Sequence, residues 1–348
     1  MFNFKKFVFI ITILVFIFNM GIVDVFAKKK SEYKYVWKIA TVAPDGVAWA
    51  KYCKKTFESK IEEVTNNNVT CSWYFGQIMG DEEDYIAKMH IDQLQGAFMS
   101  SGGVIMACRE MSIMQLPFLF NNYAEIDYIK KYMRPTFNKI LIKNGYKPLM
   151  FVHQDMDQLY STKYKMRSPQ DFEKSKVLIH AGEVADNVMK SLGASPIPMG
   201  VPEVATTMRS RICNACISPA LWWIGTQLYT ITKYVNTTPL RYSPAMIFIT
   251  MKTWNKLPES YKKAIEKELP MLENKFNKIS IDGNKRALNA MINYGVKEIK
   301  LTDKEIEVFR NKTRPVWDKL AGKLYPKEML DELLVHLDEF RKTKLTIK

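Results

Sequence analysis

Two cysteines three residues apart are the first candidates for chemistry in this sequence. Cys213 and Cys216 stand in the run Cys-Asn-Ala-Cys, a spacing typical of dithiol redox motifs and of metal pairs. A zinc site would need further Cys or His ligands, but neither a second Cys-x-x-Cys nor a His-x-x-x-His is present. Redox dithiols begin a helix, whereas residues 211–217 alternate like a strand. We interpret both cysteines as small buried residues of a strand, and a thiol oxidoreductase stays open as an alternative.

The other reactive side chains form no recognisable catalytic set. The four histidines are scattered, and no nucleophile stands near a partner base in a known pattern. The run Ser100-Ser101-Gly102-Gly103 could offer backbone N–H groups to a ligand, but it lacks the Lys of a phosphate-binding loop. The sequence therefore indicates neither an enzyme nor a cofactor or metal site.

The first 27 residues have the pattern of an export signal. Lys5 and Lys6 precede a mainly apolar run from Phe7 to Val23, and residues 25–27 end in the Val-x-Ala pattern that signal peptidase reads. We expect cleavage after Ala27 and a periplasmic protein, with an uncleaved membrane anchor as the alternative. That compartment permits disulfides, and because the cysteines number five, at least one thiol must stay unpaired.

Composition and charge describe a globular protein with a basic surface. The 348 residues include 51 Lys+Arg and 36 Asp+Glu, a net charge of +15, and 47% are hydrophobic. These values exclude a disordered or collagen-like chain, and the length is typical of two domains. We expect the excess positive charge on the outer surface, where it would favour an acidic partner protein or an anionic membrane face, and we expect no nucleic-acid partner.

Strands and helices alternate along the chain in two sets. In the first set, the patterns predict strands at 35–42, 69–74 and 96–100 and helices at 49–65 and 82–91. The second set has strands at 149–153, 176–181 and 211–217 and helices at 184–192 and 203–210. Residues 245–251 are apolar throughout and predict a central strand. Charged helical patterns follow at 260–293, 303–320 and 327–341. Together they predict two α/β lobes with a helical tail.

Seven short segments carry a family pattern in a fixed order: Lys38–Pro44, Gly76–Glu83, Leu116–Phe120, Ser168–Phe172, Leu192–Pro198, Lys233–Val235 and Trp254–Pro258. From about residue 36 to 270 they resemble the solute-binding receptors of tripartite ATP-independent periplasmic (TRAP) transporters, the DctP-like family. The resemblance implies a two-lobed, periplasmic-binding-protein-like α/β fold with crossing strands, a long spanning helix and hinge closure over a ligand. We expect lobe I at 28–150 plus about 250–295, lobe II at 151–249, and C-terminal helices at 296–348.

The sequence departs from this family where the ligand is expected. Family members usually bind carboxylates through an Arg in a Gly-x-Lys-Ile-Arg segment, and the resemblance places Leu178 at that Arg and Asp157 at a second one. The family's Val-Asp-Gly-Gln-Glu-Asn-Pro stretch becomes residues 213–219, with Ser218 in place of Asn. A carboxylate without its cation would be costly in a dry cleft. We therefore expect a hydrophobic or amphipathic ligand.

The resemblance and the aromatic content together suggest a set of ligand-binding candidates, of which Leu178 and Trp222 are expected to face the cleft. The full set is Trp49, Phe75, Ser100, Phe118, His153, Leu178, Met199, Ser218, Trp222 and Trp223. Aromatic and Met side chains at such spacings also occur in ordinary cores, and a structural role is the alternative for each. If Arg209, Arg211 or Arg241 replaces the missing cations, a carboxylate ligand is expected instead.

The resemblance also implies partners. A TRAP receptor hands its small-molecule ligand to membrane permease subunits. Within the family, one type of receptor that lacks the Arg is associated with a periplasmic helical-repeat accessory protein, and we expect such a protein as a further candidate partner. Three hypotheses follow: a receptor for a hydrophobic or amphipathic solute, a carboxylate receptor with relocated cations, and a thiol oxidoreductase.

Overall fold

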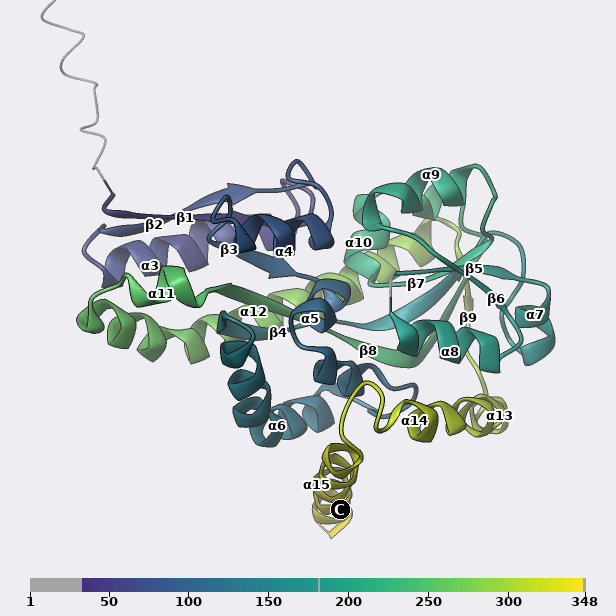
Figure 1. Cartoon of the computed structure of the whole chain (residues 1–348). Helices are drawn as coiled ribbons and strands as arrows, with labels where there is room; N and C mark the ends of the chain where they lie inside the picture. Colours follow the sequence, from purple (N-terminus) through teal and green to yellow (C-terminus); the bar gives the residue numbers. More distant parts are fainter. Residues whose placement is uncertain (1–32, 181, 347–348) are drawn as a thin grey trace, which may run out of the picture.

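The computed structural model describes residues 33–180 and 182–346, so the export signal predicted at 1–27 lies outside the described residues. Within them, a nine-stranded mixed sheet has the order β2-β1-β3-β8-β4-β7-β5-β6, and β9 pairs with β8 (Figure 1). The strands are β1 (Tyr35–Ala40), β2 (Val69–Tyr74), β3 (Gly96–Met99), β4 (Tyr146–Ser161), β5 (Lys176–Ile179), β6 (Ser195–Pro198), β7 (Ala215–Ser218), β8 (Tyr234–Thr250) and β9 (Lys297–Ile299).

Two long antiparallel strands join the lobes. β4 has 16 residues and β8 has 17, and nearly every residue in the second half of β8 is buried. In lobe I, β8 pairs with β3 through Met246 to Ile249, and in lobe II, β4 pairs with β7 through Gln158 to Ser161. Register shifts at His153/Asp155 and Asp157/Leu159 interrupt the ladder where the strands pass between the lobes. These are the crossing strands that the resemblance implies.

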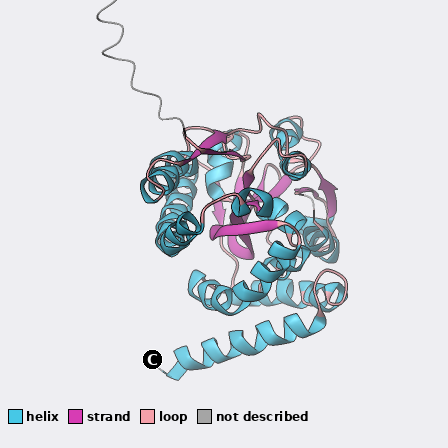
Figure 2. Ribbon diagram, turned by 60° about the vertical axis from the view of Figure 1, so that its left-hand side comes forward, coloured by secondary structure: helices cyan, strands magenta, loops and turns pink. Residues whose placement is uncertain are grey.

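Helices cover both faces of the sheet (Figures 1 and 2). The longest, α12 (Glu259–Tyr294), has 36 residues and is about 54 Å long at 1.5 Å per residue. It packs on β4, on α2 and α3 of lobe I and on α10 of lobe II, so it spans the molecule. The other α-helices are α2 (Ala48–Tyr52), α3 (Ser59–Val64), α4 (Glu82–His90), α5 (Ser101–Ala107), α6 (Tyr123–Lys143), α7 (Pro169–Glu173), α8 (Glu183–Ser191), α9 (Val204–Arg209), α10 (Ala220–Gly225), α11 (Met251–Asn255), α13 (Asp303–Thr313), α14 (Pro315–Leu320) and α15 (Lys327–Thr346).

The predicted fold class is confirmed as a two-lobed α/β fold with crossing strands and a spanning helix. The C-terminal helix α15 packs on α6, where the Arg341 guanidinium donates to the Glu125 carboxylate at 2.8 Å and 3.1 Å. Among the described residues, no helix is long and apolar enough to cross a membrane.

Several local expectations need correction. The strand expected at 149–153 is the middle of the much longer β4, and the helix expected at 303–320 divides at Pro315 into α13 and α14. Residues 211–214 form a turn in which Arg211 has a φ of 62°, so β7 begins only at Ala215 and Cys213 lies outside it. The 21-residue helix α6 was not predicted.

Candidate functional site

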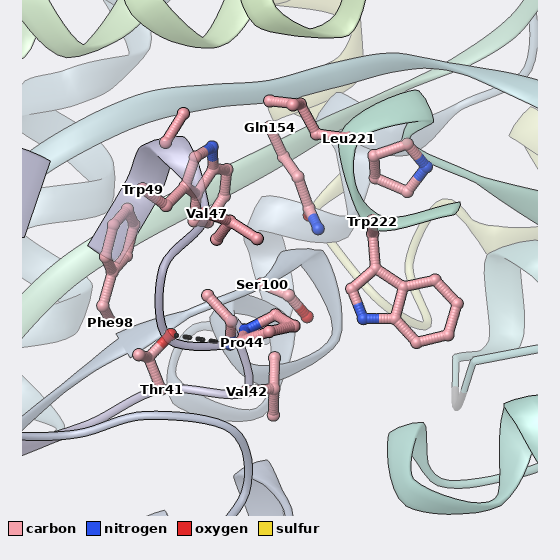
Figure 3. Close-up of a pocket in the computed structure, with 13 residues that line it drawn as sticks. Thr41, Val42, Pro44, Val47, Trp49, Phe98, Ser100, Gln154, Leu221 and Trp222 are labelled. Carbon is pink, nitrogen blue, oxygen red and sulfur yellow. Dashed lines mark hydrogen bonds between the residues drawn. The ribbon is translucent and has the colours of Figure 1, made fainter. Parts of the chain in front are cut away.

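A narrow cavity lies between the lobes, beside the crossing strands (Figure 3). Its apolar end is lined by Thr41, Val42, Ala43, Pro44, Val47, Ala48, Trp49, Phe98, Ser100, Gln154, Pro219, Leu221 and Trp222. A second, more polar cavity continues from it and shares Val42, Ser100, Gln154, Pro219 and Trp222. It adds Ser101, His180, Val201, Ser218 and Arg241. Because both lobes contribute to each end, this cavity is the site that lobe closure would cover.

Aromatic side chains from both lobes build the apolar end. Trp49 stacks on Phe98 of β3 with 4.7 Å between ring centroids, and Phe276 of α12 meets it edge-on at 5.0 Å. Opposite them, α10 supplies Leu221 and Trp222 (Figure 3). Gly283 lets α10 approach α12, because a Cβ there would lie 3.0 Å from Leu221 Cδ1. This end can bury an apolar group between flat faces.

Six of the described polar residues line the other end: Ser100, Ser101, Gln154, His180, Ser218 and Arg241. The Gln154 amide accepts a hydrogen bond from the Ser101 N–H at 3.0 Å, which leaves its Nε2 toward the cavity (Figure 3). His180 Nδ1 is buried and has no hydrogen-bond partner. Burial and the nearby Arg241 lower the pKa of His180 to about 4, so its imidazole is neutral at pH 7. The unpaired nitrogens can donate to or accept from a ligand's polar group.

Arg241 is the cation of this cavity, and it is already paired. Its Nε donates to Asp157 Oδ2 at 2.9 Å, and its Nη1 lies 3.4 Å from Gln115 Oε1. Asp157 is fully buried and also accepts from the Ser243 hydroxyl at 2.5 Å. Burial raises the pKa of Asp157, while Arg241 and Ser243 lower it. The pair, held across β4 and β8, leaves the cavity without a net charge.

Two further carboxylates occupy helix starts beside the cavity. Glu82 accepts from the backbone N–H groups of Ser100 and Gly103 at 2.5 Å and 2.8 Å, and from the Ser100 hydroxyl at 2.7 Å. Asp155 accepts from the Ala220 N–H at 3.0 Å and from the Tyr123 hydroxyl at 3.0 Å. Burial raises the pKa of each of these carboxyls to about 7. The starts of α5 and α10, where an anion could otherwise bind, are thus occupied by the protein itself.

The cavity is nearly filled. The two ends measure about 40 Å³ and 20 Å³, space for a few water molecules. Small-molecule sites usually measure several hundred Å³. Binding of any larger solute therefore requires the lobes to separate or the tryptophan side chains to turn, as a hinged receptor permits.

Four of the predicted ligand-binding residues line the cavity: Trp49, Ser100, Ser218 and Trp222. The other six do not. Leu178 and Trp223 are fully buried in the core of lobe II, where Trp223 stacks on Tyr160 at 4.5 Å. Met199 is half-buried against that same core. Phe75 belongs to a core cluster of lobe I and Phe118 to the core shared with the C-terminal helices.

His153 also has a structural position. Its Nδ1 lies 3.0 Å from the Tyr242 hydroxyl and its Nε2 lies 3.1 Å from Asp127, while its backbone N–H donates to Asn277 at 2.9 Å. It is completely buried away from the cavity, and burial lowers its pKa. These contacts link β4, β8, α6 and α12.

Of the three relocated cations considered, only Arg241 reaches the cavity. Arg209 and Arg211 line a different cavity of lobe II, together with Lys163 and Lys233. The cavity also contains residues that we did not predict, chiefly Gln154, His180 and Phe98 and the loop Thr41–Ala48. That loop follows β1 and contains part of the Lys38–Pro44 segment. The family pattern in this segment was therefore the sequence signal that could have indicated these cavity residues.

The thiol alternative has no support in the geometry. Cys213 and Cys216 are buried and free, and burial raises the pKa of both thiols, which disfavours the nucleophilic thiolate. We expect Cys213→Ser/Cys216→Ser to leave insulin reduction at the same background as the wild type. Reductase activity in the wild type that the double variant loses would contradict this.

Comparison with known proteins assigns the chain to a family. Residues 39–323 match the family described as "Bacterial extracellular solute-binding protein, family 7". The "C4-dicarboxylate-binding periplasmic protein DctP" of Rhodobacter capsulatus is 23% identical over 298 residues, which is 84% of this chain and 86% of that protein.

Solved structures agree on the fold. The sugar acid binding protein DctPAm of Advenella mimigardefordensis, in complex with galactonate, has a TM-score of 0.83 at 19% identity, covering 88% of this chain and 99% of that one. A TRAP periplasmic solute binding protein of Haemophilus influenzae with bound L-gulonate has a TM-score of 0.81 at 17% identity, with the same coverages. The matched proteins are binding proteins rather than enzymes. This chain therefore belongs to family 7 of the bacterial extracellular solute-binding proteins, the DctP family of TRAP receptors.

Proposed function

We propose that this TRAP receptor binds a neutral, hydrophobic or amphipathic small molecule in the cavity between its lobes and delivers it to membrane permease subunits. The observation that carries the proposal is the charge balance of the cavity. Arg241, the single cation among the described residues that line it, is neutralised by Asp157, and Glu82 and Asp155 occupy the neighbouring helix starts. An anionic ligand would have to compete with these carboxylates.

The lining supports a ligand with one apolar and one polar end. Trp49, Leu221 and Trp222 can enclose an apolar group, and each 100 Å² of apolar surface buried there would contribute roughly 2.5 kcal/mol. The polar group would lie near Gln154 and His180, where it can make hydrogen bonds without carrying a charge.

The proposal can be tested on the protein as purified. Native mass spectrometry and organic extraction should release a neutral compound. The apolar neutral probe N-phenyl-1-naphthylamine should bind and gain fluorescence, whereas succinate, galactonate and L-gulonate should not displace it. A bound dicarboxylate or sugar acid, or displacement of the probe by one of these anions, would contradict the proposal.

Trp222→Ala should weaken binding of the same probe by roughly tenfold or more, because it removes one wall of the apolar end. Ile224→Ala is the matched control on the same short helix, since Ile224 is partly buried but does not line the cavity. Probe fluorescence titration compares the two. Equal losses in both variants would show that binding depends on the stability of α10 and not on this wall.

The second candidate is a carboxylate receptor that uses Arg241. It is favoured by the position of the guanidinium in the polar end and by the sugar acid and dicarboxylate named for relatives. Under this alternative the ligand would take Arg241 away from Asp157, and the succinate and sugar acid titrations above would show binding.

We also propose the partners that this role requires. The permease subunits would receive the ligand when the lobes separate. A periplasmic helical-repeat accessory protein is a further candidate partner, and co-purification from the native cell envelope would test for it.

A further inference from the structure

The geometry points to a second binding site, for phosphate-class anions, in lobe II, where the end of β4, the start of β8 and the turn after α9 meet. A cavity of about 600 Å³ opens there, a volume within the usual range of small-molecule sites. Its lining is Thr162, Lys163, Met208, Arg209, Arg211, Asn214, Thr230, Ile231 and Lys233. In the described part of the chain, the site shares no lining residue with the cavity between the lobes, and its lining includes four cations and no carboxylate.

The four cations come from separate segments that the fold brings together. Lys163 follows the end of β4 and Lys233 precedes β8, and the Lys233 N–H donates to the Ser161 carbonyl at 2.9 Å. Arg209 ends α9, and its guanidinium donates to the carbonyls of Thr226 and Gln227 at 3.3 Å. Arg211 follows in a left-handed turn with φ of 62°. The strand ends and the turn therefore hold these positive charges around one hollow.

These charges have no neutralising partner among the residues that the structure describes. Within residues 33–180 and 182–346, no ion pair involves Lys163, Arg209, Arg211 or Lys233. By contrast, Arg167 pairs with Glu305 and Arg341 pairs with Glu125. All four cations are exposed, so a ligand can reach them. Gathering like charges without counter-charges costs free energy, which an anion bound in the hollow would offset.

The charge count selects the class of anion. A single carboxylate would bring one negative charge to four positive ones, whereas a phosphate or pyrophosphate group brings two or more charges and several acceptor oxygens. The Arg211 guanidinium and the two ammonium groups can each donate to such oxygens. Asn214 adds a buried side-chain oxygen without a partner, and rotation of its amide would present N–H donors instead.

Isothermal titration with inorganic pyrophosphate tests the site directly. The wild type should bind pyrophosphate, and binding should weaken as salt is raised. Lys163→Ala/Lys233→Ala should weaken it by roughly tenfold or more, since two charged donors are lost. Lys304→Ala/Lys312→Ala removes the same charge from exposed positions on α13, outside the cavity, and should change the affinity less than about twofold.

Sedimentation with vesicles separates the sources of the phosphate group. The site holds a lipid headgroup if vesicles containing phosphatidylglycerol bind the wild type but not Lys163→Ala/Lys233→Ala, and if phosphatidylcholine vesicles bind neither protein. If the wild type binds pyrophosphate but no vesicles, the ligand is a soluble phosphate compound. Arg211→Gly, which suits the left-handed turn, provides a second variant should the double variant unfold. Absence of binding in both assays, or an equal loss in the α13 control, would overturn the proposal.

Discussion

Replacing Arg241 with methionine is expected to lower the free energy of unfolding by about 3–5 kcal/mol. The reason is the buried carboxylate left behind: Asp157 is completely buried, and Arg241 is its only cationic partner among the described residues. The Ser243 hydroxyl would remain as a donor, but a neutral donor cannot replace a charge in the interior. Urea unfolding of wild type and variant at pH 7.5 measures the difference.

The same pair offers its own control. Arg241→Met/Asp157→Leu removes both charges and should recover most of the loss, because no charge is then stranded. Exposed Arg209 is a suitable comparison, and Arg209→Met should cost less than about 1 kcal/mol. A double variant as unstable as Arg241→Met would contradict the explanation.

The pH dependence has a defined sign. Burial already raises the pKa of Asp157 in the wild type, and loss of Arg241 should raise it further. A carboxyl with a raised folded-state pKa contributes stability at low pH and loses it as the pH rises through that pKa. The deficit of Arg241→Met should therefore be smaller at pH 5 than at pH 7.5.

The fold could largely be predicted because its signals are local. The pattern in residues 69–74 predicts β2 with its observed bounds, and the helix expected from residue 82 begins there as α4, where Asp81 and Asp84 cap it. The full length of β4 could not be predicted. Its second half is mostly buried and contains two carboxyl groups whose partners are distant in the sequence: the Ala220 N–H donates to Asp155, and the Arg241 guanidinium pairs with Asp157.

The site was harder to predict because it depends on which face of a strand meets the cleft. The resemblance singled out Leu178, but its side chain packs in the lobe II core beside Trp223. His180, two positions further on, reaches the cavity at the point where β5 ends. Residues two apart share a face within a strand, but His180 lies beyond the last residue of β5, where strand alternation no longer sets the direction of a side chain, so the resemblance could not separate this cavity residue from the core residue Leu178. Residue type did not help either, because Trp222 lines the cavity and Trp223 packs in the core, although both are tryptophans.

Glu82→Ala is expected to destabilise the protein by about 3 kcal/mol or more. The carboxylate is buried and accepts three hydrogen bonds, and its loss would leave the N–H groups of Ser100 and Gly103 unsatisfied beside the cavity. Gly103 is packed so closely that its neighbours cannot refill the space, since a Cβ there would already lie 2.5 Å from Met99 Sδ. Urea unfolding at pH 6 measures the loss, and Glu83→Ala, an exposed change in the same helix turn, should cost less than about 0.5 kcal/mol.

Glu82 also links stability and ligand choice to pH. Because burial raises its pKa from 4.5 to about 7, its contribution to stability is present at pH 4.5 and is lost as the pH rises to about 7, a change of about 3 kcal/mol. Glu82→Gln has no proton to release, so its unfolding free energy should fall less than that of the wild type between pH 5 and pH 8.

If Glu82 keeps anions out of the start of α5, formate should raise the melting temperature of Glu82→Ala and not that of the wild type. Equal pH slopes in wild type and Glu82→Gln, or a formate effect on both proteins, would show that this carboxylate neither titrates in this range nor excludes anions from the cavity.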